Sequence, residues 1–273
     1  MKIRVNNEAI NLEQYEGFHK KRFDVTMDIV RSIGGSRVVE LGGHPWAMTA
    51  RLLREPDIEL IATVSAEEET AWPDELPSVK REYTLDVDGQ DTSHFFNYSA
   101  NIERTQFPLD EKADIVLACE IIEHMMRSPH IMLLNANSWL DIGGYIVITT
   151  PNGSQLENPF RVRPKMPAYR YSSYSRHNYV FTLDGLIDLV SACGFEIVSA
   201  EYFSPYERKG LSDLYRGLMK IPGEYAKAKF AQSLCVVARK MKDCDAADRL
   251  PKVYVPSPDW ERLEQVKQSI DVG

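Results

Sequence analysis

The stretch Val38-Val39-Glu40-Leu41-Gly42-Gly43 is an apolar strand that ends at a carboxylate and continues into a glycine turn. An acidic side chain beside a turn that exposes backbone N–H groups can hold a small polar ligand. Open α/β sheets bind their ligands at this carboxyl edge of the strands. The stretch therefore predicts an α/β sheet with a binding site at the end of its first strand.

Two later segments repeat this combination of an apolar strand with polar residues after it. Residues 113–120 are apolar up to Cys119 and Glu120, and the pair Glu123-His124 follows closely. Residues 143–152 start with two glycines, continue with β-branched residues and end in Thr-Pro-Asn. These segments supply further strand ends for the same edge of the sheet.

Hydrophobic periodicity predicts the remaining elements. Strands are expected at 58–64, 95–100, 195–198 and 234–238. Helices are expected at 11–33, 48–54, 130–140 and 183–192, and glycines follow the first and the last of them. Strands that alternate with helices in this way are typical of a doubly wound α/β sheet.

Taken in order, these motifs resemble those of the class I S-adenosylmethionine-dependent methyltransferases. The likeness is greatest to a bacterial subgroup with Glu-His after the fourth strand and Thr-Pro-Asn after the fifth, and it covers roughly residues 35–200. It implies a seven-stranded Rossmann-like sheet, methyltransferase activity and S-adenosyl-L-methionine as cofactor. One departure stands out: His44 and Trp46 replace the second and third glycines of the family's Asp/Glu-x-Gly-x-Gly-x-Gly motif.

The chain divides into three predicted parts. Residues 1–34 are expected to form an N-terminal helical cap, and 35–242 the methyltransferase domain, with a lid at 153–182 after the fifth strand. Residues 243–273 are expected to form a polar tail with a surface helix at 259–268. Residues 68–93 are interpreted as an insertion, because prolines and a cluster of acids interrupt any helical pattern there.

Composition excludes several classes of protein. The chain has 273 residues, of which 44% are hydrophobic and 26% charged, which suits one globular α/β domain with additions. A net charge of −8 argues against nucleic-acid binding. No apolar run approaches the roughly 20 residues of a membrane span, and no secretion signal opens the sequence. The four cysteines have neither zinc-site nor Cys-x-x-Cys spacing, so a cytoplasmic protein is expected. Homo-oligomer formation is left open.

The resemblance implies a set of cofactor-binding residues. Glu40 would lie near the methionine amino group, and Asn101 would accept a hydrogen bond from the adenine amino group. Asn stands there in place of the family's usual Asp, but an amide carbonyl accepts the same bond; a turn cap is the alternative role of Asn101. The ribose ligand is not assigned. The cofactor-binding residues predicted in this way are Glu40, Leu41, Gly42, Gly43, His44, Asn101, Ile102, Cys119 and Glu120.

Methyl transfer to a hydroxyl needs a proton acceptor, and histidine is the usual one near neutral pH. His177 lies in a segment, residues 175–182, that resembles the subgroup's Arg-His-x-x-x-Phe/Tyr-Thr. We predict His177 as the catalytic base, with a non-catalytic role in substrate binding as the alternative. His124 is the second candidate for the base, although the Glu123-His124 pair is also expected to order the start of a helix.

The predicted lid is positively charged, whereas the chain as a whole is negatively charged. Between Asn158 and Leu183 there is no Asp or Glu, but five Lys or Arg residues and four tyrosines. Arginine forks bind phosphate or carboxylate, and tyrosines pack on flat rings. The alternative is a solvated loop whose charges bind nothing. The predicted substrate-binding residues are His124, Arg161, Arg163, Arg170, Tyr174 and Arg176.

The sequence thus predicts O-methylation of a hydroxyl on a sugar, glycan or other polar metabolite, including anionic ones. One alternative is methylation of nitrogen or carbon in a small molecule or quinone-like precursor. Another is a non-catalytic, cofactor-binding regulatory protein, suggested by the incomplete glycine motif. A nicotinamide dehydrogenase is disfavoured because Gly-x-Gly-x-x-Gly is absent. No spacing of His, Asp and Glu indicates a metal site, and none is expected.

Overall fold

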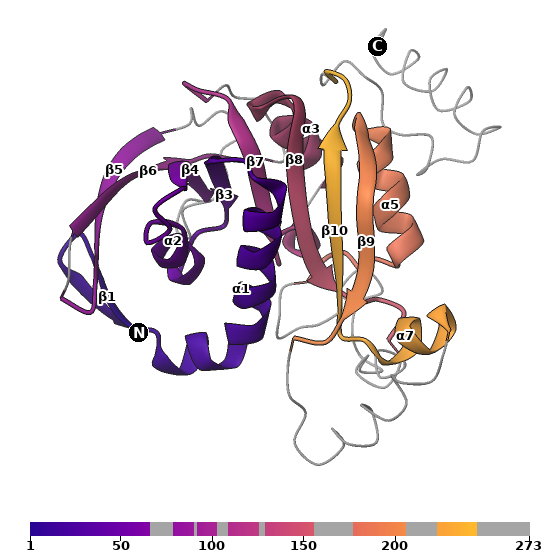
Figure 1. Ribbon diagram of the computed structural model, residues 1–273, viewed down its shortest axis with the longest axis horizontal. Coiled ribbons are helices and arrows are strands. Elements are labelled where there is room, and N and C mark those ends of the chain that lie inside the picture. Colours follow the sequence, from indigo (N-terminus) through magenta and orange to yellow (C-terminus); the bar gives the residue numbers. More distant parts are fainter. Residues whose placement is uncertain are drawn as a thin grey trace, which may run out of the picture.

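The computed structural model describes residues 1–65, 79–89, 92–102, 109–125, 129–155, 177–205 and 223–244. These residues build a ten-stranded mixed sheet with helices on both faces (Figure 1). The strands are β1 (Lys2–Val5), β2 (Glu8–Asn11), β3 (Arg37–Leu41), β4 (Glu59–Ser65), β5 (Val79–Val87), β6 (Thr92–Ser99), β7 (Ala113–Cys119), β8 (Leu140–Pro151), β9 (Phe195–Phe203) and β10 (Ser233–Lys240). The helices are α1 (Glu13–Ile33), α2 (Ala47–Leu52), the 3-10 helix η1 (Ile122–His124), α3 (Pro129–Trp139), α5 (Leu183–Ala192) and α7 (Glu224–Phe230).

The centre of the sheet is a block of five parallel strands in the order β6-β4-β3-β7-β8. Antiparallel β10 lies between β8 and β9 and closes one side. These seven strands are the ones predicted from the sequence, and the predicted helices 11–33, 48–54, 130–140 and 183–192 are confirmed as α1, α2, α3 and α5. Parallel strands bring their carboxyl ends to one edge of the sheet, which is where the site residues were predicted.

The predicted strand count of seven is wrong for the described residues, because three further strands extend the sheet beyond β6. β5 pairs antiparallel with β6, and β1 pairs with both β5 and β2. Residues predicted as an insertion therefore include a strand, and the first residues of the predicted helical cap form a hairpin. Asn6 and Asn7 connect β1 to β2 with φ of 48° and 71°, the left-handed values that a two-residue type I′ turn requires.

The sheet separates two hydrophobic cores. Residues of β7 alternate between them: Ile115 and Leu117 pack with α1 and α2, whereas Val116 and Ala118 pack with α3 and α5. This alternation is the period of two that a strand buried on both faces imposes on its side chains. No helix of the described ranges has the length and apolar character needed to cross a membrane.

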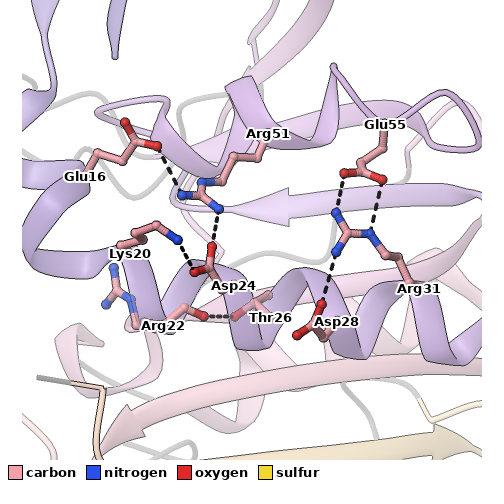
Figure 2. Close-up of polar contacts among 9 residues, drawn as sticks. All are labelled: Glu16, Lys20, Arg22, Asp24, Thr26, Asp28, Arg31, Arg51 and Glu55. Carbon is pink, nitrogen blue, oxygen red and sulfur yellow. Dashed lines mark hydrogen bonds and ion pairs between the residues drawn. The ribbon is translucent and has the colours of Figure 1, made fainter.

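Ion pairs join α1 to α2 on their polar side (Figure 2). Arg51 of α2 donates to Asp24 at 2.7 Å and to Glu16 at 3.1 Å, both on α1. The Arg51 guanidinium also lies over the Phe23 ring, at 5.3 Å. Such a network holds the two helices at a fixed position relative to each other, and α1 in turn carries Arg22 into the buried layer above the sheet.

Two predictions lie wholly or mainly outside the described residues. The surface helix at 259–268 falls in the part that is not described, and so does most of the predicted lid, from 156 to 176. The division into cap, methyltransferase domain and tail stays a prediction.

Candidate functional site

The predicted cofactor residues gather at the carboxyl edge of the parallel strands. Leu41 at the end of β3 pairs with Val64 near the end of β4, and Ser65 pairs with Ser99 at the end of β6. On the other side of β3, Cys119 at the end of β7 lies beside Thr149 of β8. The segments after these strands therefore meet along one edge, and each of them contains residues that the sequence singled out.

Glu40 is a buried carboxylate near the end of β3, with 5% of its surface exposed. Its side chain faces α2 and accepts a hydrogen bond from the Thr49 hydroxyl at 2.5 Å. Burial raises the pKa of Glu40 from 4.5 to about 7, and the bond from Thr49 partly opposes this rise. One helix thus holds the carboxylate in a defined orientation beside the glycine turn.

The turn after β3 requires its glycines. Gly42 has a φ of +71°, and its N–H donates to the Val64 carbonyl at 2.8 Å. A Cβ atom on Gly42 would lie 2.0 Å from the Ile121 side chain. Gly43 is close to the Trp46 ring, which a Cβ would approach to 2.9 Å. The absence of side chains at these two positions therefore allows Ile121 and the Trp46 ring to pack directly on the turn.

Trp46 stands where the family motif has its third glycine, and it keeps a glycine-like backbone. Its φ is +71°, in the left-handed region that bulky residues avoid. Its ring is 7% exposed and packs against Tyr83 of β5 and Phe95 of β6, with centroids 5.5 and 5.4 Å away. Aromatic packing of this kind offsets backbone strain. His44, at the second glycine position, is exposed and is joined to Pro45 by a cis peptide bond.

Asn101 and Ile102 lie just beyond β6, after Ala100. The Ile102 carbonyl accepts a hydrogen bond from the Asn135 side chain of α3 at 2.9 Å. The Ile102 side chain packs against the core between the sheet and α3. This anchoring fixes the backbone at the position where an adenine ring is predicted to lie, while residues 103–108 fall outside the described ranges.

Cys119 is the last residue of β7 and Glu120 follows it, and their side chains have different surroundings. Burial raises the pKa of the Cys119 thiol to about 11, so this sulfur is not a nucleophile near neutral pH. Glu120 has a φ of +56° and forms an ion pair with Arg22 of α1 at 3.5 Å. Its Oε1 is buried without a hydrogen-bond partner. Burial raises the pKa of this carboxyl, although Arg22 opposes the rise.

Glu123, His124 and His177 form a compact cluster just beyond Glu120. Glu123 is 1% exposed, and its Oε2 accepts a hydrogen bond from the Thr150 hydroxyl at 3.0 Å. Its other oxygen, Oε1, has no hydrogen-bond partner. The Nε2 atoms of His124 and His177 lie 3.9 and 4.0 Å from that oxygen. The two imidazole rings meet edge to face, with centroids 4.8 Å apart.

Backbone hydrogen bonds bring His177 to this position. The N–H groups of Asn178 and Tyr179 both donate to the Glu123 carbonyl, at 2.7 and 3.0 Å. The Asn178 side chain adds a bond to the His124 carbonyl at 3.1 Å. The end of the predicted lid therefore returns to the sheet edge immediately before α5, and this places the imidazole of His177 beside η1.

Burial is the largest cause of the pKa shifts of Glu123 and His177. It raises the pKa of Glu123 well above its ordinary value, and the charge of neighbouring Glu120 adds to the rise. Burial also lowers the pKa of His177 from 6.5 to about 4, and the proximity of His124 contributes. His177 is therefore neutral near pH 7 and carries an available nitrogen lone pair. The lid residues Arg161, Arg163, Arg170, Tyr174 and Arg176 lie outside the described ranges.

Three residues of the site were missed by the sequence analysis. Thr49 and Arg22 come from helices and contact the carboxylates of Glu40 and Glu120, and nothing in the local sequence marks either contact. Glu123 was noted for its place beside His124, but only the fold shows that its side chain faces two imidazoles. The Glu-His pair itself was the available signal.

Comparison with known proteins agrees with this geometry. A family model described as a methyltransferase domain matches residues 27–200, which is more than half of the chain. Among solved structures, a SAM-dependent methyltransferase from Archaeoglobus fulgidus is similar, with a TM-score of 0.53 and 17% identity over 84% of this chain and 97% of that one. An S-adenosylmethionine-dependent methyltransferase from Clostridium acetobutylicum gives a TM-score of 0.52 and 9% identity over 82% and 92% of the two chains.

At such identities these structures show the fold alone, and a search of curated proteins finds no match. The family match carries the identification, because it covers the glycine turn, the ends of the parallel strands and η1 within one aligned stretch. The chain belongs to the methyltransferase-domain family: it is an S-adenosylmethionine-dependent methyltransferase with S-adenosyl-L-methionine as its cofactor.

Proposed function

We propose that this methyltransferase transfers the methyl group to a hydroxyl oxygen of a sugar, glycan or other polar metabolite. The observation that carries the proposal is the cluster of Glu123, His124 and His177, which lies at the same sheet edge as the predicted cofactor residues. A hydroxyl is the acceptor that most needs such groups, because it keeps its proton near neutral pH unless a neighbour lowers its pKa or accepts the proton.

The residues at the sheet edge suit the cofactor. S-adenosyl-L-methionine supplies an activated methyl group on a sulfonium, together with an ammonium and an adenine. The Glu120 Oε1 is a buried acceptor without a partner, which suits an ammonium donor. Gly42 and Gly43 form the turn after β3, where the resemblance places the methionine part of the cofactor. We assign the adenine to Asn101 and Ile102, where an amide carbonyl and an apolar side chain lie together.

His177 is our prediction for the proton acceptor. Its lowered pKa keeps the imidazole neutral near pH 7, so Nε2 can accept a proton from a bound hydroxyl. The Glu123 carboxyl lies 4.0 Å away, and in its ionised form it would stabilise the imidazolium that forms. Both side chains are largely shielded from water, which strengthens that electrostatic interaction.

The lid sequence supports a polar acceptor, including an anionic one. Its five basic residues and four tyrosines between Asn158 and Leu183 suit phosphate, carboxylate and sugar-ring contacts. An apolar quinone-like acceptor would instead need an apolar lid. The alternative of a non-catalytic regulatory protein rested on the incomplete glycine motif, and Trp46 weakens it by keeping the left-handed backbone at the third glycine position. The bacterial subgroup with Glu-His and Thr-Pro-Asn stays part of this proposal.

The test is product analysis with a labelled cofactor. The full chain is incubated with S-adenosyl-L-methionine carrying a ¹³C methyl group and with separate pools of sugars, sugar phosphates, hydroxy acids, amines and quinols. We expect a methyl ether signal by NMR in a pool of polar hydroxyl compounds. A methyl group on nitrogen or carbon would refute the proposed acceptor class. Tight cofactor binding without turnover in any pool would favour a regulatory protein.

A further inference from the structure

The cluster of Glu123, His124 and His177 is also a set of metal ligands. We propose that these three side chains bind one divalent transition-metal ion, which holds the acceptor hydroxyl and lowers its pKa. One carboxylate oxygen and two imidazole nitrogens lie within 4.8 Å of one another, and His177 joins the adjacent pair Glu123-His124 from a distant part of the sequence. The presence of the site is independent of the acceptor, whereas the role of the ion rests on the proposed function.

The donor atoms select the class of ion. Two imidazoles with one carboxylate are typical ligands of zinc and other first-row transition metals, and three protein ligands leave positions open for substrate or water. Magnesium and calcium prefer oxygen ligands instead. The two histidines are partly exposed, with 39% and 21% of their side-chain surface accessible, so an ion bound between them would be reachable from solvent.

The distances are close to those of a ligated ion. Ligand atoms about 2.1 Å from a tetrahedral metal lie roughly 3.4 Å from each other. The two Nε2 atoms are 3.9 and 4.0 Å from the same Glu123 oxygen. The three ligand atoms span up to 4.8 Å, so rotations that move each imidazole nitrogen by roughly half to one ångström would complete the geometry. The backbone already holds the two histidines beside Glu123 through the bonds from Asn178 and Tyr179.

An independent observation points to a ligand at this position. The Glu123 Oε1 is buried and has no hydrogen-bond partner, and it is the oxygen that both imidazoles face. A buried carboxylate oxygen without a donor or a cation is costly in free energy. The other oxygen is held by Thr150 at 3.0 Å, as second-shell partners commonly hold metal-binding carboxylates. Glu120 is a second buried carboxyl that interacts with Glu123, and it forms an ion pair with Arg22 at 3.5 Å.

A bound ion changes the chemistry expected of His177. Its Nε2 would hold the ion, so the ion would acidify the acceptor in place of the imidazole. The hydroxyl would then lose its proton to water, and its oxygen would attack the methyl carbon. The carbon–sulfur bond would break with its electron pair remaining on sulfur, giving a methyl ether and S-adenosylhomocysteine. His177 cannot ligate the ion and accept a proton through the same nitrogen at the same time.

The test measures metal binding directly on the full chain. After treatment with a chelator and dialysis, the protein is titrated with Zn²⁺ and Mn²⁺, with Mg²⁺ as comparison, and bound metal is counted by mass spectrometry. We expect one Zn²⁺ per chain. Glu123→Gln and His177→Ala should each weaken binding by at least about 100-fold, and Thr150→Val by roughly 10- to 100-fold. His94→Ala is the matched control, because His94 also lies beside a glutamate, Glu82, but on the exposed surface.

The possible results separate the site from its role. Absence of a stoichiometric ion in the wild type, or binding unaffected by the three substitutions while His94→Ala reduces it, would overturn the proposal. Circular dichroism and the unfolding temperature show that each variant is folded. A bound ion whose removal leaves methyl transfer unchanged would confirm the site and refute its role in acidifying the acceptor. Failure to methylate any acceptor would count against the proposed function and leave the metal site standing.

Discussion

Glu40 and Glu123 are both buried carboxylates that accept a hydrogen bond from a threonine hydroxyl, yet their surroundings differ. Glu40 lies inside β3 under α2. Glu123 lies in the short helix η1, and one of its oxygens faces two imidazoles without a hydrogen bond. Burial raises the pKa of both groups.

We infer that two regions at the same sheet edge have different roles, one in cofactor binding and stability and the other in turnover. The region after β3 is shaped by its glycines, by Trp46 and by a fixed carboxylate, so we expect its residues to affect cofactor affinity and stability. The region after β7 contains groups with available lone pairs, so we expect its residues to affect turnover. The following predictions test that separation, beginning with the largest effect.

Trp46→Ala should lower the free energy of unfolding by about 3–5 kcal/mol, as loss of a large buried side chain usually does. The ring is 7% exposed and packs on β5 and β6, and the left-handed backbone remains when it is removed. Urea unfolding would measure the change. Trp46→Phe, which keeps a ring, should lose clearly less. A loss below about 1 kcal/mol in Trp46→Ala would show that the added strands do not support this turn.

Glu40→Gln should change the pH dependence of stability. Because burial raises the pKa of Glu40 from 4.5 to about 7, the folded chain binds this proton more tightly than the unfolded chain does. The resulting stabilisation is complete below about pH 4.5 and is lost as the pH rises to about 7. The variant lacks this loss, so its stability relative to wild type should increase by up to about 3 kcal/mol over that window.

Urea unfolding at several pH values would measure this difference. Glu59→Gln, at the exposed start of β4, serves as control and should follow the wild type. A Glu40→Gln curve parallel to that of the wild type would mean that Glu40 is ionised in the folded chain.

His177→Ala should reduce turnover by roughly 10²-fold or more while cofactor affinity stays near that of the wild type. If His177 accepts the proton without a bound ion, the acid limb of the wild-type rate should lie near pH 4 and not near the ordinary histidine value of 6.5, because burial lowers the pKa of His177. Steady-state kinetics across pH and titration calorimetry with the cofactor check both points. A substituted enzyme with full turnover would transfer the role to His124 or to positioning alone.

Glu40→Ala should weaken cofactor binding by at least about tenfold, which is about 1.4 kcal/mol. The carboxylate lies beside the glycine turn and is held there by Thr49, so its removal changes both charge and packing. Titration calorimetry on the folded variant measures the affinity. Unchanged affinity would remove Glu40 from the cofactor site and leave it a structural residue.

The smallest effect is expected in the lid. Arg163→Gln and Arg170→Gln should each raise the KM of an anionic acceptor by up to about fivefold, about the size of a single ion pair in water. Cofactor affinity should not change. Kinetics at low and high salt would check this, because screening should reduce the difference. If a neutral acceptor is preferred and both variants match the wild type, the segment is a solvated loop.

Much of the fold could be predicted because most of its strands and helices have a clear hydrophobic pattern within their own residues. Strands β3, β7 and β8 are near-continuous apolar runs, and α5 begins at the predicted residue. β5 was missed since acids and prolines around it hid the alternation that buries Leu85 and Val87. The left-handed Trp46 was not predictable either, because such a backbone depends on packing from β5 and β6.

The candidate site was predictable only in part, for a related reason. The ends of parallel strands locate Glu40, Asn101 and Glu120 once the order of elements is known. The pairing of Arg22 with Glu120, and of His177 with Glu123, depends on contacts between segments far apart in the chain. An oxygen without a hydrogen bond is a property of three-dimensional packing, so no motif could reveal it.

The attachment of His177 to η1 has a consequence for how this enzyme can diversify. The two bonds to the Glu123 carbonyl come from main-chain N–H groups of Asn178 and Tyr179. Any amino acid except proline can donate such a bond. These two bonds can therefore survive exchange of the neighbouring side chains, by evolution or in the laboratory, although the Asn178 side chain adds its own bond to the His124 carbonyl. Substitutions in the segment before His177 could therefore change the acceptor preference while the His177 imidazole stays beside η1.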